Sequence, residues 1–577
     1  MSRWLLNRRA PLLIALLGFL LALPTLRLGY FLDDFYHMYA LDGGELPGGP
    51  KGNWDLYRFA SGQPTLGEAK ASGYFAWWTS DDFRIAFLRP IPSLWRALDH
   101  ALFGANALIP HLETCVVFGL LVWTVSKLLK RFLGDSPAAV IAAMLGTLAF
   151  AIDDSHATSI SWIANRYALV AALFGALSFV TLGSQSGRVR ALSAPLWILA
   201  LLSGEASLCF VAFFGAWIWL HKGDERRVMF KRTLPHVLCL AAWVIAYKLG
   251  GYGVKGSGFY VDPASTPIAF LAKMFIRAPV LFLAQLTFIP AEASGPLVPH
   301  AHYVLAAIGL VVSLLGVRWI DRTCERSRPV RALLLAGFVG LLPMTATAPD
   351  DRLLLIPGIA IFGALGAALA KKLEHRRLGG KFGGAASFFT AAHFVIAPLL
   401  FVPRQSVYYD LLGPFIRKHA QELPADEAIR EQRLFILAAP DALLTSFMYI
   451  ERIVGSAPNP RASFLLTVGS PGDLIVTRPA ANELVFSAEG GLVGGPFAHL
   501  YRATPFVDGE RVDVDVFEAH VVRTTDGHLM EVAFTFKQPL ESARWVIFGE
   551  QGFTEVTLPA VGESARFDGW DLGRAMN

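Results

Sequence analysis

APLLIALLGFLLALPTLRLGYFLDDFYHMYAL, residues 10–41, is the stretch that decides the fold. Its apolar first part, about 20 residues long, is long enough to cross a bilayer as a helix. Similar runs recur along the chain as far as residue 402 and then stop. Of the 577 residues, 54% are hydrophobic and 17% are charged, and the mean hydropathy is +0.46. These values exclude a soluble enzyme, a disordered protein and a fibrous repeat, and they leave a polytopic membrane protein with one soluble domain.

The hydropathy pattern predicts an all-α membrane domain over residues 1–402 with about eleven transmembrane helices. The expected spans are 10–29, 107–126, 137–152, 167–183, 191–203, 206–220, 234–250, 301–317, 332–348, 353–370 and 385–402. We interpret 191–220 as a tight hairpin with Ser203-Gly204-Glu205 at its tip, because both of its flanks are basic. Segment 268–289 contains basic side chains, which favours a re-entrant or interfacial helix over a twelfth span.

Lys and Arg are concentrated in alternate loops, which predicts the orientation of the chain. The basic segments are 1–9, 127–136, 184–191, 221–233, 318–331 and 371–384. Cytoplasmic loops carry such an excess, so we expect a cytoplasmic N-terminus and an extracytoplasmic soluble domain. The first apolar run lacks a small-residue cleavage site and is expected to be retained as a span. A bacterial inner membrane fits these features, and basic residues scattered over short loops do not indicate a nucleic-acid partner.

Charged side chains gather at the expected outer ends of the spans. They are Asp33, Asp34, Asp153, Asp154, His156, Glu205, Asp350, Asp351 and Arg352. Each alone has a structural interpretation, such as a helix cap or a local ion pair. Ionisable groups at membrane depth are nevertheless costly and commonly functional. Their position on one side predicts a polar cleft at the outer membrane surface.

The residue types in this cleft suggest a group-transfer reaction. A carboxylate can act as general base on an acceptor hydroxyl, and paired carboxylates can hold a divalent cation. An arginine fits a phosphate leaving group, because its planar guanidinium donates two hydrogen bonds. Together these residues predict transfer from a lipid-linked phosphate donor.

Five segments, in order, resemble one known family. They are FLDDFYHMYAL (31–41), FLRPIPSLWRALDHALFGANALIPHLE (87–113), AFAIDDSHATSISWIANRYALVAALF (149–174), LLSGEASL (201–208) and APDDRLLLIPG (348–358). The sequence resembles the GT-C superfamily of integral-membrane glycosyltransferases. That group includes protein O-mannosyltransferases, TMTC-type mannosyltransferases and the bacterial aminoarabinose transferase. The resemblance covers about residues 10–370.

The resemblance implies a glycosyltransferase that moves a sugar from a polyprenyl-phosphate donor to an acceptor on the outer face, with inversion. It makes a first-loop acid, Asp33 or Asp34, the general base, with a slight preference for Asp34. Arg352 becomes the contact to the donor phosphate. The further candidates for donor or substrate binding are Arg89, Arg166, Glu205, Asp153 and His156. The sugar, hexose or pentose, and the acceptor, whether protein, lipid or glycan, stay open.

Two segments depart from the family pattern. The second loop has Asp153-Asp154-Ser155-His156 where His-Pro-x-His is usual, and the hairpin tip has Gly204-Glu205 where Lys-Glu is common. The missing lysine removes one phosphate contact. The two acidic pairs permit Mg²⁺ or Mn²⁺, with Asp34 and Asp154 as the candidate ligands, although the sequence does not require a metal.

Residues 403–577 form the expected soluble domain, which we predict to be mixed but mostly β. RVDVDVFEAHVVR (511–523) and LMEVAFTFK (529–537) alternate apolar and polar residues, as half-buried strands do.

The long outer loop 37–86 contains Trp77 and Trp78, which we place at the membrane interface, and a Gly-rich part, 43–53, which we expect to be flexible.

Two other classes of function remain open from the sequence. One is a transporter or flippase for a lipid-linked or anionic substrate, although no internal repeat supports it. The other is a catalytically inactive GT-C scaffold that presents the C-terminal domain.

Overall fold

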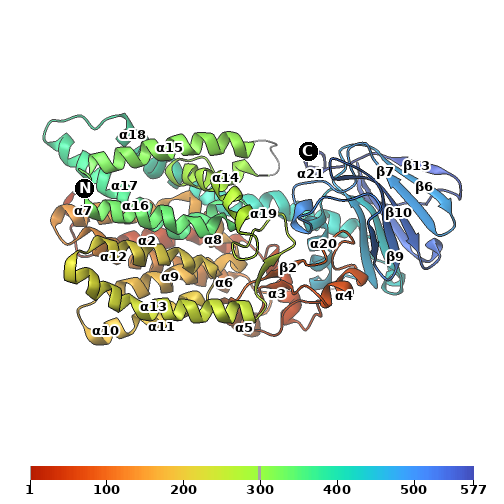
Figure 1. Cartoon of the computed structure of the whole chain (residues 1–577), viewed down its shortest axis with the longest axis horizontal. Helices are drawn as coiled ribbons and strands as arrows, with labels where there is room; N and C mark the ends of the chain where they lie inside the picture. The colour runs from red at the N-terminus through yellow and green to blue at the C-terminus, as the bar shows by residue number, and fades with distance from the viewer. Residues whose placement is uncertain (1, 296–300, 456, 577) are drawn as a thin grey trace.

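The computed structural model describes residues 2–295, 301–455 and 457–576. The chain forms a helical bundle followed by a domain of sheets, and the two lie end to end along the longest axis (Figure 1). The N-terminus and the short helix α10 (Gly187–Ala191) lie at the end of the bundle farthest from the sheets. The predicted all-α membrane domain followed by a mixed, mostly β domain is therefore confirmed as an architecture.

Nine helical segments of the described residues are long and apolar enough to cross a membrane, and a bent pair would make ten. The nine are Ala10–Arg27 (α2, η1), Leu108–Leu133 (α6), Ile163–Leu182 (η3, α9), Gly223–Leu249 (α13), Pro267–Leu286 (α14), Ala301–Thr323 (α15), Arg328–Ala346 (α16, η6), Asp351–Arg377 (η7, α17) and Gly384–Glu422 (α18, η8, α19). The bent pair is α7 (Pro137–Ile152) with Asp154–Ser161 (η2, α8), and it bends by 49°.

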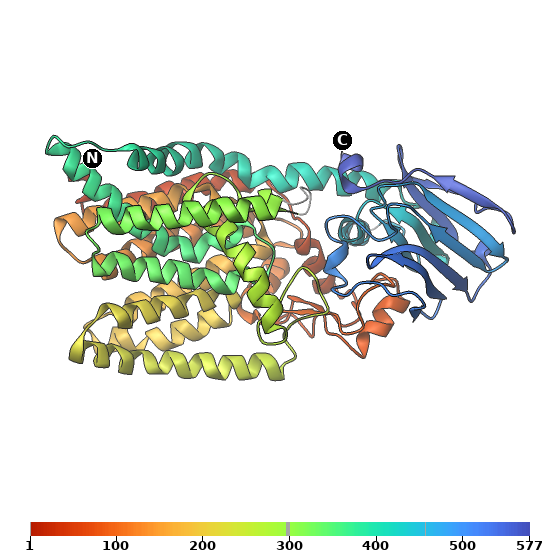
Figure 2. The same ribbon diagram turned by 45° about the horizontal axis from the view of Figure 1, so that its top comes forward.

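The number of spans differs from the predicted eleven at the hairpin 191–220. Its arms are α11 (Ser193–Leu201) and η4 with α12 (Glu205–Leu220). Both are shorter than a bilayer-crossing helix needs. Helix α14, over the ambiguous segment 268–289, has the length and composition of a span but runs obliquely to its neighbours (Figures 1 and 2). That it is re-entrant stays a prediction.

The central helix of the bundle is α17, and 94% of the residues in its most apolar stretch are buried. Its closest neighbour is α7, and glycines bring the two backbones together. A Cβ added to Gly146 would lie 2.7 Å from the carbonyl oxygen of Phe362, and one added to Gly366 would lie 2.4 Å from the Gly146 nitrogen. In a membrane the hydrophobic effect does not drive helices together, because lipid tails are as apolar as the side chains. Small residues favour association there, since they allow two helices to pack closely. The contact fixes the segments that follow α7 and precede α17.

The C-terminal part contains two sheets that share one core. The six-stranded antiparallel sheet has the order β13-β6-β7-β10-β9-β8, and the four-stranded sheet has the order β12-β11-β4-β5 with β4 parallel to both neighbours. The strands are β4 (Arg433–Ala439), β5 (Ala462–Val468), β6 (Leu474–Ala480), β7 (Glu483–Ser487), β8 (Arg511–Asp513), β9 (Phe517–Thr525), β10 (His528–Phe536), β11 (Arg544–Gly549), β12 (Gly552–Glu555) and β13 (Ser564–Phe567). Helix α20 (Ala442–Val454) joins β4 to β5.

Helix α19 (Ala397–Glu422) runs without a break from the bundle into the soluble domain. The expected domain boundary, between residues 402 and 403, falls inside this helix. The bundle and the soluble domain are thus connected by a continuous helix rather than by a flexible linker.

The first outer loop packs into the soluble domain. It contains α3 (Asp33–Leu41), β1 (Arg58–Ala60), α4 (Thr65–Ala71), β2 (Arg84–Ala86) and α5 (Pro90–Phe103), and β3 (Gly253–Lys255) completes a small sheet with β1 and β2. The indole nitrogen of Trp77 donates to the carbonyl oxygen of Leu466 at 2.9 Å. Trp77 and Trp78 are buried in the core of the soluble domain, so their predicted place at the membrane interface is wrong.

Candidate functional site

Asp34 lies at the start of α3 and holds two loops together. Leu32, just before the helix, has a φ of 45°, which turns the chain sharply into α3. The two carboxylate oxygens of Asp34 accept hydrogen bonds from backbone nitrogens, one from Phe31 at 3.0 Å and one from Ala164 at 2.7 Å. Asp34 is fully buried, and burial raises its pKa to about 7. Its carboxylate therefore connects the first outer loop to the second.

Asp33 precedes Asp34 in the same helical turn but has a different environment. Its side chain is half-buried, and within the described part of the chain its carboxylate makes no hydrogen bond or ion pair. Burial raises the pKa of Asp33 to about 6, while the positive charges of Arg352 and Arg89 act to lower it. Asp33 is thus an unpaired carboxylate near two arginines.

Arg89 is held in place by the hairpin tip. Its Nε donates to Glu205 Oε2 at 2.9 Å, and its guanidinium carbon lies 3.5 Å from the centre of the Tyr167 ring. Gly204 makes this approach feasible, because it has a φ of 152° and an added Cβ would lie 2.7 Å from the Tyr167 ring. A side chain at 204 would displace the ring on which Arg89 rests. The hairpin tip thus contributes a counter-charge and a close turn.

Arg352 lies in the turn η7 (Asp351–Leu354) before α17, and its positive charge also acts on Asp33. Its Nε lies 3.3 Å from Asp350 Oδ2, and its guanidinium carbon lies 5.0 Å from the centre of the Trp162 ring. Its two terminal nitrogens donate no hydrogen bond to any residue that the structure describes. Two strong donors on a fixed arginine therefore remain available for a ligand.

Tyr260 is a member of this group that the sequence reasoning missed. Burial raises the pKa of its hydroxyl, and the charges of Arg352, Asp33 and Arg89 all act on it. Tyr260 follows β3 in a loop without strong periodicity, so the sequence contains no signal for it. We call Asp33, Arg89, Arg352, Tyr167 and Tyr260 the Asp33 group.

The acidic residues of the second loop bind the last helix rather than Arg352 or Arg89. Asp153 Oδ2 accepts from His393 Nδ1 at 2.9 Å, where the π-helical turn η8 (Ala392–Ile396) precedes α19. Asp154 Oδ2 accepts from Arg404 Nη1 at 2.9 Å. His156 is fully buried against the rings of Phe118, Phe150 and Phe362. In the structure these residues connect α7 and α8 to α19.

Arg404 is the centre of a four-residue ion-pair network. Besides Asp154, it contacts Asp351 Oδ2 at 2.6 Å and Glu292 Oε2 at 3.4 Å. The backbone nitrogen of Ala291 also donates to Asp351 Oδ1 at 2.8 Å. The sequence reasoning missed Arg404, His393 and Glu292, because it assigned the first to the soluble domain and the others to apolar or loop segments.

Arg166 is fully engaged by two carboxylates. It pairs with Asp99 and, at 2.8 Å, with Glu113, and its guanidinium lies 4.7 Å from the Trp95 ring. These partners come from α5 and α6. Arg166 therefore joins three helices, and it has no unused charge of the kind that Arg352 has.

The candidate metal ligands do not fit a shared ion. Both oxygens of Asp34 accept backbone hydrogen bonds, and Asp154 pairs with Arg404. Among the residues that the structure describes, there is no group of three or more His, Cys, Asp or Glu side chains arranged to hold a metal.

No protein-family model matches the chain, and no curated protein matches it. Among solved structures, it is similar to the crystal structure of ArnT from Cupriavidus metallidurans bound to undecaprenyl phosphate. The two chains share 12% sequence identity at a TM-score of 0.36, over 90% of this chain and 97% of that one. At this distance the roles of individual residues have to come from the contacts of this chain.

Proposed function

We propose that the protein is a membrane glycosyltransferase that moves a sugar from a polyprenyl-phosphate donor to a hydroxyl acceptor. The single observation that carries this proposal is the unpaired carboxylate of Asp33 beside two arginines, whose terminal nitrogens donate no hydrogen bond to any residue that the structure describes. A base and a phosphate binder are the two groups that such a transfer needs. The Asp33 group lies at the end of the bundle that faces the soluble domain, away from the basic loops, which supports an extracytoplasmic reaction.

The proposed reaction is a single displacement at the anomeric carbon of the sugar. Asp33 accepts the proton of the acceptor hydroxyl, and the acceptor oxygen forms a bond to the anomeric carbon. The bond between that carbon and the phosphate oxygen breaks, and both of its electrons leave with the phosphate. Arg352 stabilises the charge that develops on the phosphate. Attack on the face opposite the leaving group inverts the anomeric configuration.

Within this proposal, Asp33 is the base rather than Asp34. A general base must reach the proton that it removes, and both oxygens of Asp34 are already engaged by backbone N–H groups. Asp34 instead fixes the turn from which Asp33 projects. This reverses the slight preference for Asp34 drawn from the sequence.

Arg89 is proposed to act at the same site as a second positive charge. Each arginine is paired through Nε, Arg89 with Glu205 and Arg352 with Asp350. We assign the main phosphate contact to Arg352, as the family resemblance implies. The charges of both arginines act on the Tyr260 hydroxyl, which is proposed to contact the donor.

The test is mass spectrometry of the lipids that co-purify with the protein in mild detergent. We expect the wild type to retain a polyprenyl phosphate or its glycosylated form. We expect Asp33→Asn to retain the glycosylated donor, because its transfer is blocked, and Arg352→Ala to lose the lipid. The mass of the retained sugar then identifies a hexose or a pentose.

Arg328→Ala is the matched control. Arg328 lies 4.7 Å from the Trp219 ring, much as Arg352 lies over Trp162, but it starts the span that ends at Ala346. It is therefore at the opposite end of the bundle and should leave lipid retention unchanged. Equal loss from both arginine variants, or bulk phospholipid alone in every sample, would reject the donor site. A transporter would retain the lipid but show no change of sugar with Asp33→Asn.

A further inference from the structure

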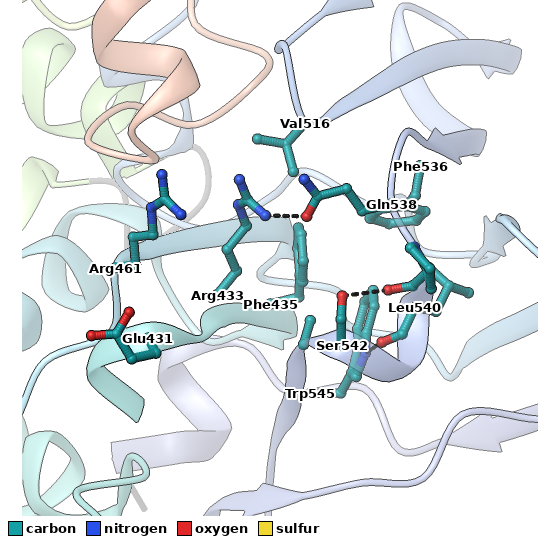
Figure 3. A pocket seen from close by; sticks show the side chains of 12 residues that line it. Glu431, Arg433, Phe435, Arg461, Val516, Phe536, Gln538, Leu540, Ser542 and Trp545 are labelled. Atoms are coloured by element: carbon teal, nitrogen blue, oxygen red, sulfur yellow. Dashed lines mark hydrogen bonds between the residues drawn. The ribbon is translucent and has the colours of Figure 1, made fainter. Parts of the chain in front are cut away.

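The soluble domain contains a cavity that shares no lining residue with the Asp33 group. It has a volume of about 240 Å³ and lies where β4 and β5 begin, beside the segment that follows β10. Figure 3 shows its polar and aromatic lining. Its lining includes Arg433, Arg461, Gln538, Phe435, Phe536 and Trp545.

Two arginines stand on neighbouring strands at this cavity. Arg433 pairs in register with Ala462, and Arg461 directly precedes that residue. The backbone nitrogen of Arg461 donates to the carbonyl oxygen of Gln432 at 3.0 Å, which fixes its position beside β4. In Figure 3 both arginine side chains point in the same direction. Like charges opposite each other on adjacent strands are destabilising, and a bound anion would relieve that repulsion.

Neither of these arginines makes an ion pair with any residue that the structure describes. Arg433 donates to the neutral side chain of Gln538. Glu431 also lines the cavity, but it makes no ion pair with either arginine. Most other arginines of the domain have a carboxylate partner, as in Arg478–Glu541, Arg502–Glu510, Arg511–Glu518, Arg544–Glu555 and Arg566–Asp473. The cavity therefore concentrates the unpaired positive charge of this sheet.

The floor of the cavity is apolar and tightly packed. The rings of Phe435 and Trp545 are stacked with centres 4.7 Å apart, and Phe536 meets Phe435 edge-on at 5.3 Å. The indole nitrogen of Trp545 donates to the carbonyl oxygen of Leu540 at 2.8 Å, so it is not available to a ligand. The polar side chains of the lining are those of Arg433, Arg461, Gln538, Glu431 and Ser542, and only the first three offer donors that no carboxylate or backbone carbonyl group of the domain neutralises.

We propose that this cavity binds the anionic group, carboxylate or phosphate, of a small ligand. Arg433 and Arg461 supply charged donors, since guanidinium groups match both anions in two-point hydrogen bonds. The volume is below the range of about 300–1,000 Å³ typical of sites for drug-sized ligands, so it fits a group no larger than a monosaccharide. This site is additional to the proposed transfer reaction and does not depend on it.

The test is isothermal titration of the full-length protein in detergent with three probes: inorganic phosphate, glucuronate and glucose. We expect saturable binding of at least one of the two anions and none of glucose, because the charge carries recognition. Binding of glucuronate alone identifies a carboxylate site, and binding of phosphate alone identifies a phosphate site. Added sodium chloride should weaken the binding, as it screens the two arginines.

The variant Arg433→Gln/Arg461→Gln should weaken anion binding at least tenfold. The matched control is Arg511→Gln/Arg566→Gln, which removes two arginines of the same domain that have carboxylate partners, and it should bind as the wild type does. Arg352→Ala should also keep this binding, which separates the cavity from the Asp33 group. Equal binding by the Arg433→Gln/Arg461→Gln variant, equal binding of glucose, or no binding of either anion by the wild type would overturn the proposal.

Discussion

Asp33 and Asp34 are adjacent in the chain, yet only the second is hydrogen bonded through both carboxylate oxygens. The Phe31 and Ala164 nitrogens donate to Asp34 at 3.0 and 2.7 Å. Asp33 has no such donors in the described structure and lies near Arg352 and Arg89. The pair thus divides into a residue that fixes the loop and a residue that is available to a substrate.

The substitutions Asp33→Asn and Asp34→Asn should therefore have different effects. Asp33→Asn removes a base, so we expect a loss of about 10²–10⁴-fold in kcat with little change in thermal stability. Asp34→Asn replaces one carboxylate oxygen by an NH₂ group, which cannot accept the backbone hydrogen bond. One buried backbone N–H then lacks an acceptor, so we expect a loss of about 1–3 kcal/mol of stability. Transfer assays and thermal unfolding of the purified variants measure both. Reduced kcat at unchanged stability for Asp34→Asn, with a fully active Asp33→Asn, would reverse the assignment.

The pH dependence of the transfer should report the ionisation of Asp33. Burial raises its pKa to about 6, and only the ionised carboxylate accepts a proton. Activity should then be low below pH 6 and should rise as the pH increases through that value. A profile of kcat/KM against pH from about 5 to 8 measures this. A flat profile over that range would count against Asp33 as the base.

Loss of Arg404 should destabilise the membrane domain. Its guanidinium pairs with Asp154, Asp351 and Glu292, and Arg404→Gln would leave these carboxylates buried without a positive partner. We expect a loss of about 3–5 kcal/mol, as for other broken buried pairs, seen as a lower unfolding temperature in detergent.

Arg430→Gln serves as the control for this experiment. Arg430 pairs with Glu427 at the surface, where both side chains are more than half exposed. Its removal should cost about 0–1 kcal/mol. If the two variants unfold at the same temperature, the network around Arg404 does not contribute to stability as we infer.

Gly73 should be intolerant of a side chain. It has a φ of 75°, and an added Cβ would lie 2.1 Å from the carbonyl oxygen of Ser463 in β5. We expect Gly73→Ala to separate the first outer loop from the soluble domain at a cost of about 1–3 kcal/mol. Limited proteolysis should then cut the loop between α4 and β2 faster than in the wild type.

Gly67→Ala is the corresponding control in the same loop. Gly67 lies in α4, and an added Cβ would meet no atom within 4 Å. Alanine favours a helix over glycine by about 1 kcal/mol, so this variant should resist proteolysis at least as well as the wild type. Equal cleavage of the two variants would show that the Gly73 contact does not hold the loop.

The sequence predicted those parts of the architecture that depend on the length of an apolar run. Long apolar runs such as 10–29 and 353–370 became helices near those positions, because a span must satisfy its backbone groups internally. The alternation in 511–523 and 529–537 became β8, most of β9 and most of β10. The length of the apolar run did not predict the end of α19, since the helix continues past that run to Glu422. Nor did hydropathy predict the burial of the loop 37–86, which depends on a partner about 400 residues away in the chain.

The candidate site was predictable only in its members that lie at span ends. Asp33, Glu205 and Arg352 could be named as charged groups on one side, whereas Arg89 came only from the family resemblance. The structure brings the four near one another. The different roles of Asp33 and Asp34 could not be predicted, because they depend on which backbone nitrogens reach Asp34. Nor could the separation of Asp153 and Asp154 from this group, since it follows from the positions of His393 and Arg404 on the last helix segment.

The burial of Trp77 in the soluble domain sets an order for biogenesis. Ribosomes complete residues 58–86 long before β4, β5 and β10, which supply the core for Trp77 and Trp78. The loop is therefore made first and stays without its partner, with its indoles exposed, until the C-terminal strands have been made. A translation stop after the last bundle helix would leave an apolar loop without a partner, a target for chaperones and proteases on whichever side of the membrane it lies. Quality control of the nascent chain can thus detect the missing C-terminal end at a segment made near its beginning.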